Sequence, residues 1–510
     1  FFMQTPEERS DGDPTTSDGV YVLTTRTPSS FGVAVGDRIT LEGRVKEYYG
    51  LTQIEVNSRQ STVVLSSNNP LPQPIDLKMA ALDWTVGEDV HPLERYEGMY
   101  VRVADAEVFA PTNYFDEFGI TLTGERPFRE AGVEIDLYPE QAEYDVPRFD
   151  LNPELIEVDP EEMGLPVEFV TVGSVVTVTG GLSYSYRDYQ IWPSDLQVDL
   201  AEYQPRPVRD RAEGEYTIAT QNMENFFDLV NDPGRDDSPM EDYVPDRQEN
   251  YEIRLRKLSE QVRVVLGAPD ILAIQEIENA RVLTDLIFQI HQDDPTLRYA
   301  GCFQEGNDDR GIDNAFIVRT DRVNLLTCER LPGSLTALAP LSGQRLFGRP
   351  PLVLEAELLT DPTVRITLVN LHIKSLSGAE TEIVQVRRMA QALMVADYVQ
   401  ALLNEDPARN VVLLGDLNSY EVSDGLVDVQ GILAGDVDPS EALLSPDYDP
   451  LEPNLVNQAL RVPAGERYSY IYNSTSQVLD SILTTPGLDA FVTDAQFSRG
   501  NADALHPWHE

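Results

Sequence analysis

Short apolar runs that end in polar side chains recur through the second half of this chain. The run Val411-Val412-Leu413-Leu414 leads into Gly415-Asp416-Leu417-Asn418, which predicts a buried strand with polar residues at its end. Asp416 and Asn418 alternate with Leu417, so an extended chain would place both on one side. In layered α/β folds that side is a crevice at the carboxyl ends of the strands, where ligands bind. A strand followed by an ordinary polar turn is the alternative for an isolated motif of this kind.

The same half of the chain alternates predicted strands with amphipathic helices, which is typical of an α/β domain. Apolar periodicity predicts helices over residues 248–266, 280–291 and 381–403. Apolar runs predict strands over residues 215–222, 269–276, 314–319, 352–358, 365–372 and 478–483. Polar residues follow or end these strands at Asn222, Glu276, His372, Asp416, Asn418 and Asp480. Because so many strands end in this way, we expect the polar side chains to share one crevice.

The first 200 residues instead alternate apolar and polar positions and are rich in Val, Ile, Thr and Tyr, which predicts antiparallel β structure. Residues 35–43 recur at 172–180, and the same offset of 137 relates 45–54 to 182–191. This internal repeat predicts two β modules, over 1–75 and 76–200, the second with an acidic surface insertion at 134–162. A charged linker with prolines at 201–214 would connect them to a domain over 215–510.

The β modules resemble the small oligonucleotide- or oligosaccharide-binding (OB) barrels, which hold single-stranded nucleic acid on aromatic rings. Candidate rings are Tyr48, Tyr49, Tyr184, Tyr186 and Trp192. Packing of these rings in small β cores is the alternative, and the acidic surroundings favour it. The strand that opens the second copy, near residue 100, would have its counterpart before residue 1, so we expect a chain shortened at its start.

Acidic residues outnumber basic ones by 87 to 38, which gives a net charge of −49. Such a surface is typical of a salty or extracellular environment, and it repels nucleic acid at long range. A polyanionic substrate would therefore need local attraction by arginines and a bound divalent cation. No run of about 18 apolar residues is present, so the sequence predicts no membrane-spanning helix and no membrane partner.

The residue types at the strand ends suit metal-assisted hydrolysis of a phosphate ester. Glu276, helped by Asn222, would hold a hard cation such as Mg²⁺, which takes oxygen ligands and keeps several waters. Asp416 would activate water as a general base, and Asn418 would hold a phosphate oxygen. His372 would donate a hydrogen bond to another phosphate oxygen or to the leaving oxygen.

Five motifs in order resemble the endonuclease/exonuclease/phosphatase superfamily, which has a deoxyribonuclease-I-like fold. They are Gln221-Asn222, Gln275-Glu276-Ile277-Glu278-Asn279, Asn370-Leu371-His372-Ile373-Lys374-Ser375, Gly415-Asp416-Leu417-Asn418-Ser419 and Leu479-Asp480-Ser481-Ile482-Leu483. The resemblance implies a four-layer α/β sandwich that cleaves DNA, with RNA as an alternative, using Mg²⁺ or else Ca²⁺ or Mn²⁺. Further features at Asn225-Phe226-Phe227-Asp228, residues 310–316 and Tyr468-Ser469-Tyr470 resemble large secreted bacterial nucleases. They imply an extracellular or periplasmic protein, which we expect to be a monomer.

By motif, the resemblance assigns Asn222 and Glu276 as metal ligands, His372 as a phosphate contact, Asp416 as the base and Asn418 as its oxyanion partner. It assigns Asp480 to the orientation of a second histidine. The Ser-Asp-His-x-Pro segment that carries this histidine in the family does not occur in these 510 residues. We therefore expect a chain shortened at its end, whose parent protein is an enzyme; whether the chain is active without this segment is left open by the sequence.

Four further residues are candidates for substrate binding. Arg345 and Arg349 lie in a Gly/Pro-rich loop beside the proposed site, and Arg310 and Asn225 lie in the resembling segments. For Arg310, a structural ion pair with Asp313 is the alternative.

Two cysteines, Cys302 and Cys328, lie 26 residues apart on what look like neighbouring strands. They predict either one disulfide or two buried thiols.

Three functions compete. The favoured one is a secreted nuclease that degrades extracellular DNA; the second is a phosphatase or phospholipid phosphodiesterase of the same fold; the third is a non-catalytic protein that binds nucleic acid or matrix. The acidic surface disfavours anionic membranes, and the β modules favour a polymer as substrate.

Overall fold

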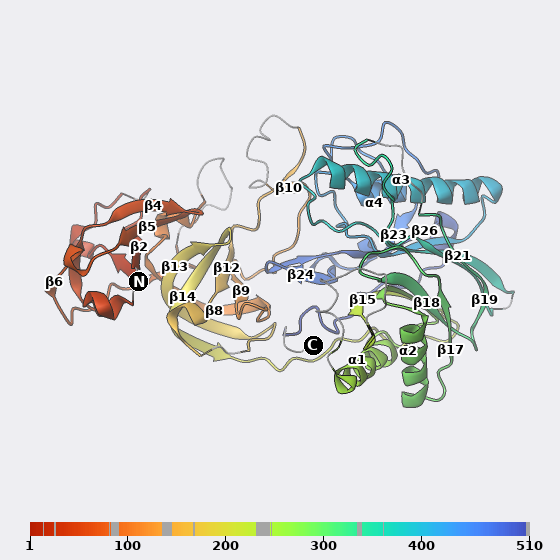
Figure 1. Cartoon of the computed structure of the whole chain (residues 1–510), viewed down its shortest axis with the longest axis horizontal. Helices are drawn as coiled ribbons and strands as arrows, with labels where there is room; N and C mark the ends of the chain where they lie inside the picture. Colours follow the sequence, from red (N-terminus) through yellow and green to blue (C-terminus); the bar gives the residue numbers. More distant parts are fainter. Residues whose placement is uncertain are drawn as a thin grey trace.

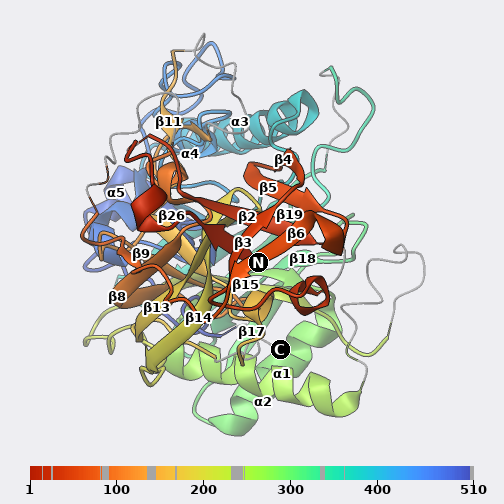
Figure 2. The same cartoon turned by 90° about the vertical axis from the view of Figure 1, so that its left-hand side faces the viewer.

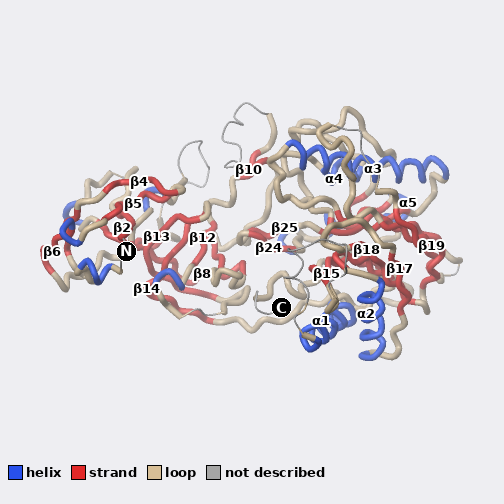
Figure 3. Tube along the Cα trace, in the orientation of Figure 1, coloured by secondary structure: helices blue, strands red, loops and turns tan. Residues whose placement is uncertain are grey.

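A computed structural model of the chain describes residues 1–13, 15–24, 27–80, 82, 91–134, 145–166, 169–230, 245, 247–333, 339–360 and 362–505. Two β modules lie side by side and are followed by a larger layered domain (Figure 1). The long helices belong to the layered domain, whereas the modules consist of strands, loops and short 3-10 helices (Figure 3). None of the described helices is long and apolar enough to span a lipid bilayer.

Two sheets lie face to face in the layered domain (Figure 1). The first contains, in spatial order, β15 (Ile218–Phe226), β16 (Ile271–Ile277), β18 (Asp313–Arg319) and β17 (Tyr299–Phe303). The second contains β19 (Val323–Arg330), β20 (Leu352–Leu358), β21 (Val364–His372), β22 (Val411–Asp416), β26 (Asp480–Thr484) and β23 (Val456–Asn457). Parallel pairing of β15 with β16, and of β21 with β22, aligns the carboxyl ends of these strands.

Helices cover the outer face of each sheet (Figure 1). The helices are α1 (Gln248–Glu260), which continues into a π-helical turn, α2 (Ala280–Asp293), α3 (Glu382–Glu405), α4 (Val429–Ala434) and the short α5 (Pro486–Asp489). Phe316, Leu354 and Leu414 are buried in the apolar layer between the sheets. Because β16 and β22 are buried on both faces, their sequences are continuous apolar runs rather than alternating ones. The predicted four-layer α/β sandwich is confirmed.

A disulfide joins Cys302 on β17 to Cys328 on β19. Of the two alternatives left open by the sequence, the structure therefore has the disulfide. Since β17 belongs to the first sheet and β19 to the second, the bond links the two sheets covalently.

Within the described residues, the second module closes into a five-stranded barrel. Its strands are β8 (Tyr100–Ala110), β9 (Phe118–Thr121), β12 (Leu155–Val158), β13 (Val175–Ser185) and β14 (Asp188–Asp199). They pair in the order β8-β9-β12-β14-β13, and β13 pairs again with β8. Only the β12–β14 pair of this barrel is parallel. The short strand β7 (Ile75–Asp76) pairs with β8, so the sheet of this module already begins at Ile75.

The first module repeats part of this arrangement; Figure 2 shows it facing the viewer. Its strands are β1 (Phe2–Gln4), β2 (Gly19–Thr24), β3 (Arg38–Leu41), β4 (Arg44–Tyr48), β5 (Leu51–Val56) and β6 (Thr62–Ser66). The parallel pair β2–β5 corresponds to β12–β14. Gln53 and Gln190, which are equivalent in the sequence repeat, both lie in these parallel ladders and are both buried. The sequence repeat therefore reflects a structural one.

The prediction of an acidic surface insertion over residues 134–162 is wrong for the second half of that range. Strand β12 lies within it, and Leu155, Ile156 and Val158 are buried in the barrel. Surrounding acids and prolines dominate the local composition, so a strand of four residues gave no visible pattern. Within the first half, β10 (Val133–Glu134) pairs with β11 (Arg148–Phe149), and residues 135–144 lie outside the described residues.

A hairpin of the layered domain is bound by the barrel module. It consists of β24 (Tyr470–Tyr472) and β25 (Thr475–Gln477). The Ser476 backbone N–H donates to the Pro127 carbonyl at 2.9 Å, and the Arg129 N–H donates to the Ser476 carbonyl at 2.9 Å. Asn152 Nδ2 also donates to Thr475 Oγ1 at 3.1 Å. The chain leads from this hairpin directly into β26, so the barrel holds the segment that precedes Asp480.

Candidate active site

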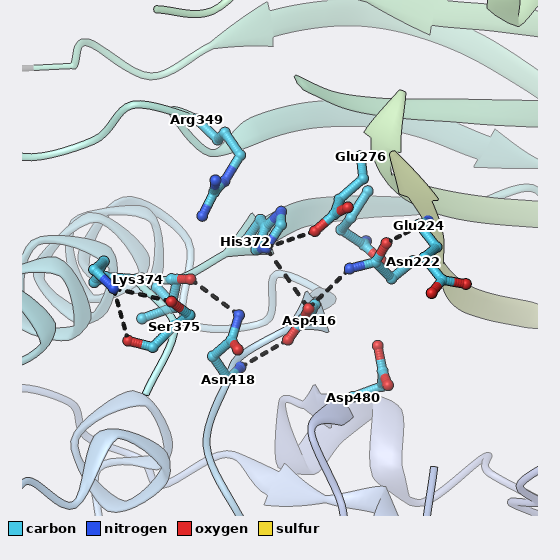
Figure 4. A network of polar contacts seen from close by, with 12 residues as sticks. Asn222, Glu224, Glu276, Arg349, His372, Lys374, Ser375, Asp416, Asn418 and Asp480 are labelled. Atoms are coloured by element: carbon cyan, nitrogen blue, oxygen red, sulfur yellow. Dashed lines mark hydrogen bonds and ion pairs between the residues drawn. The ribbon is translucent and has the colours of Figure 1, made fainter. Parts of the chain in front are cut away.

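Neighbouring strands bring the predicted polar side chains to one edge of the two sheets. In the second sheet, His372 pairs with Asp416, and Asp416 pairs with Asp480. In the first sheet, Asn222 lies beside Gln275, so Glu276 follows at the same edge. Figure 4 shows the side chains from both sheets directed towards one another. The shared crevice expected from the strand ends is present.

Asp416 makes hydrogen bonds with Asn222 of the first sheet and with the turn that follows its own strand. Its Oδ2 accepts a hydrogen bond from Asn222 Nδ2 at 3.0 Å, and its Oδ1 accepts one from the Asn418 backbone N–H at 2.8 Å. His372 Nε2 lies 3.6 Å from Asp416 Oδ2 and 3.7 Å from Glu276 Oε1. Glu276 Oε2 accepts a hydrogen bond from the Asn225 backbone N–H at 2.8 Å. The imidazole therefore lies between the carboxylates of Asp416 and Glu276. The hydrogen bonds that these two carboxylates accept fix their orientation.

Asn418 reaches the site by a turn and not by strand alternation. Strand β22 ends at Asp416, and Asn418 adopts the left-handed backbone conformation, with φ of 44°. Its Nδ2 donates to the Ile373 carbonyl at 3.2 Å. Glu276 is also left-handed, with φ of 61°, and such strain is concentrated at functional sites. Asp416 and Asn418 line one crevice, as predicted. The reason given, alternation of side chains along an extended strand, was wrong, because a left-handed turn brings Asn418 to the site.

A cavity of about 380 Å³ lies at this edge, and its lining contains both acidic and basic side chains. The acidic residues are Glu276 and Asp416, and the basic residues are Arg310, Arg349 and Lys374. His372, Ser375 and Asn418 complete the lining. Such a cavity suits a phosphate group, because the cationic side chains compensate its charge while the carboxylates can hold a metal ion or activate water.

Three of the four predicted substrate residues lie at this site. Arg310 and Arg349 line the cavity, and Arg310 Nη1 donates to Asn225 Oδ1 at 3.1 Å. Arg349 Nη1 forms an ion pair with Asp308 at 2.9 Å, which fixes the guanidinium. Arg345 is exposed and lines neither this cavity nor the larger groove beside it.

Lys374 and Ser375 were missed as cavity residues. Lys374 Nζ donates to Ser375 Oγ at 2.9 Å and to the Ser377 carbonyl at 3.0 Å. Their signal in the sequence was their place directly after His372 in the recognised motif.

Burial and neighbouring charges shift the pKa values of the central groups. Burial raises the pKa of Asp416 to about 6, opposed by hydrogen bonds from Asn222 and Asn418. Burial, followed by the negative charge of Asp416, raises the pKa of Asp480 to about 8. Burial, followed by the positive charges of Arg349 and Arg310, holds the pKa of His372 well below its usual value. His372 is therefore neutral at pH 7, and Asp416 is largely ionised.

The donor set fits a divalent cation that keeps part of its water. Mg²⁺ is usually held by one or two carboxylates together with waters, and Glu276 presents a carboxylate to the cavity. The like charges of Glu276, Asp416 and Asp480 raise the pKa values of the latter two, and a cation would relieve this repulsion. Across the described ranges, no three His, Cys, Asp or Glu side chains cluster so as to enclose a metal ion. A cation held by Glu276 would therefore keep waters in its remaining coordination positions.

Asp480 lies beside this cavity, on the wall of a larger groove. Its backbone N–H donates to Ser469 Oγ at 3.3 Å, whereas its Oδ1 is buried and makes no hydrogen bond with any described residue. The second histidine that Asp480 was predicted to orient is not found among the described residues. His91 packs on Tyr189, and His291 Nδ1 contacts the Leu297 carbonyl. His506 and His509 lie outside the described residues.

Comparison with known families shows to which protein family the chain belongs. The model of the endonuclease/exonuclease/phosphatase family matches residues 217–497, more than half of the chain. The chain belongs to the endonuclease/exonuclease/phosphatase family. Members of this family are generally hydrolases of phosphoester bonds. A domain of unknown function matches residues 90–201, which contain the barrel of the second module.

Several solved structures are similar to the chain, each over 53% of its length. Humanized TDP2 of D. rerio is 17% identical, with 82% of that protein covered and a TM-score of 0.33. A family member from Bacteroides thetaiotaomicron is 15% identical, with 83% covered and a TM-score of 0.32. ANGEL2, a 2′,3′-cyclic phosphatase, is 12% identical, with 84% covered and a TM-score of 0.37. No curated protein sequence matches the chain.

Proposed function

We propose that this protein is a divalent-cation-dependent nuclease that hydrolyses phosphodiester bonds of DNA. The observation that carries the proposal is the cavity that Glu276, His372 and Asp416 line together with Arg310 and Arg349. It combines a carboxylate for a cation, a base for water and fixed positive charges for a phosphate group. A bound cation would stabilise the negative charge that develops on the phosphate.

The residues of the chain then have distinct roles. Asp416, with a pKa of about 6, is ionised at neutral pH and accepts the proton of the attacking water. The hydrogen bonds from Asn222 and from the Asn418 backbone hold its carboxylate in place. The neutral His372 donates from Nε2 to a phosphate oxygen. Arg310 and Arg349 compensate the charge of the phosphate.

The surroundings of the cavity favour a polymeric substrate. The cavity shares Glu276, Asp416 and Asn418 with a groove of about 1500 Å³, far larger than a simple phosphomonoester requires. The strand order of the barrel, with its single parallel pair, is the arrangement expected of an OB-like module, a class that binds oligonucleotides.

We also propose that the protein acts outside the cytoplasm of a bacterium. The disulfide between Cys302 and Cys328 and the net charge of −49 support this location, because disulfides persist in oxidising compartments.

A substrate panel tests the proposed activity. The purified protein is incubated with plasmid DNA, RNA, sphingomyelin and a small phosphomonoester, each with Mg²⁺ and with EDTA. We expect Mg²⁺-dependent nicking of the plasmid that is lost in Glu276→Ala and in Asp416→Ala. Glu329→Ala, which removes an exposed carboxylate on β19, is the matched control. Phosphate release from the monoester alone would indicate a phosphatase, and no turnover of any substrate would contradict a catalytic role.

A further inference from the structure

The catalytic cavity opens into a groove that has walls from two parts of the chain. The layered domain contributes Asn222, Glu276, Asp416 and Asp480 to it. The barrel module contributes Arg129, Phe149, Leu151, Tyr186 and Arg187. A ligand that extends beyond the catalytic cavity therefore meets the barrel, and the contacts between the hairpin and the barrel hold the two walls together.

Tyrosine rings lie exposed along this groove. Tyr470 and Tyr472, on β24, are 46% and 59% exposed, and their rings are 6.5 Å apart with planes inclined by 18°. Tyr186, in the turn between β13 and β14, is 88% exposed. Figure 1 places β24 between the barrel and the two sheets. Rings this exposed do not stabilise a core, whereas their faces suit the stacking of planar groups.

One of these rings lies close to the catalytic carboxylates. Tyr470 lines the same groove as the carboxylates of Glu224, Glu276 and Asp416. Glu224 itself adjoins the site, because its backbone N–H donates to Asn222 Oδ1 at 2.8 Å. Tyr470 therefore lines the groove together with residues of the proposed catalytic site.

The duplicated turns of the two modules extend the aromatic surface. Gly50, in the turn between β4 and β5, packs against the ring of Tyr184, so the turn of the first module lies beside that of the second. Tyr49 is 83% exposed in this turn. Trp192, by contrast, is buried against Phe2 and Tyr21, so this candidate platform belongs to a core.

We propose that the groove binds single-stranded polynucleotide, whose bases stack on Tyr186, Tyr470 and Tyr472 while its backbone leads one phosphodiester into the catalytic cavity. This inference rests on the proposed function. It assigns substrate binding to the module that matches a domain of unknown function. Stacking is well suited to this protein, because its net charge of −49 opposes long-range attraction of nucleic acid. Paired bases cannot stack on the rings, so a single strand is preferred over a duplex.

Binding without cleavage tests this inference. Fluorescence anisotropy in EDTA measures the affinity of the whole protein for labelled oligo-dT of about 4 and about 16 nucleotides, the span of single-strand sites on barrels of this kind. A hairpin duplex is the comparison. We expect the longer single strand to bind more tightly than both the shorter one and the duplex. Tyr186→Ala and Tyr472→Ala should each weaken single-strand binding about tenfold, and Tyr472→Phe should restore it.

Tyr448→Ala is the matched control, because Tyr448 is 53% exposed and lies outside the lining of the groove. Its affinity for the single strand should equal that of the wild type. Equal binding of single strand and duplex, or unchanged binding in both tyrosine variants, would overturn the inference. A neutral hexasaccharide that displaces the oligonucleotide would also overturn it, because the groove would then bind sugars. Tight, tyrosine-dependent binding without cleavage of any nucleic acid would support the inference while the proposed nuclease activity fails.

Discussion

Replacement of Glu157 by glutamine should make the stability of the barrel less dependent on pH. Glu157 lies on β12, is 6% exposed, and accepts hydrogen bonds from Gln190 Nε2 at 3.2 Å and Ser474 Oγ at 3.3 Å. Burial, followed by the negative charge of Asp188, raises its pKa from 4.5 to about 7. It therefore connects the barrel core to the hairpin that precedes Asp480.

The expected magnitude follows from this shift in pKa. Between pH 4.5 and 7 the folded protein keeps the Glu157 proton that the unfolded chain loses, so stability falls as the pH rises through this window. The pKa of Glu157 differs between the unfolded and folded states by about 2.5 units, which corresponds to about 3 kcal/mol of folding free energy. This contribution to the stability of the wild type is fully lost above pH 7. Glutamine is neutral at every pH. It can also keep both contacts, because its oxygen accepts from Gln190 and its amide donates to Ser474 Oγ.

Urea denaturation followed by the fluorescence of Trp192, which lies on β14 and is buried against Phe2 and Tyr21 of the first module, measures the effect. At pH 8 we expect Glu157→Gln to be more stable than the wild type by about 3 kcal/mol, and at pH 5 by only about 1 kcal/mol. Glu329→Gln, which replaces an exposed glutamate, should change neither value. Equal stabilisation at both pH values, or destabilisation at pH 8, would refute the reasoning.

Further predictions concern buried contacts of the layered domain. Asn370→Ala removes a fully buried amide that accepts a hydrogen bond from Gln275 Nε2 at 2.6 Å and donates to carbonyls of β16 and β18. We expect the free energy of unfolding, measured by urea denaturation, to fall by about 3 kcal/mol. A decrease below about 1 kcal/mol would contradict this role. Arg388→Met removes a buried guanidinium that donates to the backbone carbonyls of residues 374 and 418 and pairs with Asp424, and should cost about 3–5 kcal/mol. Adding Asp424→Leu should recover much of this stability but not the hydrolytic activity; recovery of both would show that Arg388 does not position the site. Replacing both Cys302 and Cys328 by serine removes a bridge over 26 positions and should lower the free energy of unfolding by about 3.5 kcal/mol; an unchanged urea midpoint would contradict it.

The local pattern of apolar and polar residues was sufficient to predict most strands and helices of the layered domain. The strand predicted over residues 352–358 matches β20, and the helix predicted over 381–403 lies within one residue of the start of α3 and two of its end. The candidate site was also predictable, because Glu276, His372 and Asp416 lie at the ends of apolar runs that become the buried strands β16, β21 and β22. Asn222 lies instead within the half-buried β15, and Asp480 begins β26 and does not end it. Burial on both faces of a strand is a property of consecutive residues, so it is visible without knowledge of the fold.

Other features depended on contacts between distant segments. The left-handed turn at Asn418, the place of Lys374 in the cavity, and the exclusion of Arg345 from it are decided by how the two sheets pack. Strand β12 was hidden in acidic sequence, because its burial comes from β9 and β14 and not from its neighbours in the chain.

Taken alone, the order of residues determined which segments become strands and helices, that a β module occurs twice, and which side chains stand at the strand ends. Tertiary structure alone decided that β15 and β16 face β21 and β22 across one cavity, and that Tyr186 shares a groove with Tyr470. The physical reason is that burial patterns arise from neighbouring residues, whereas packing joins residues that are far apart in the sequence, such as Asn222 and Asp416, which are separated by 194 positions.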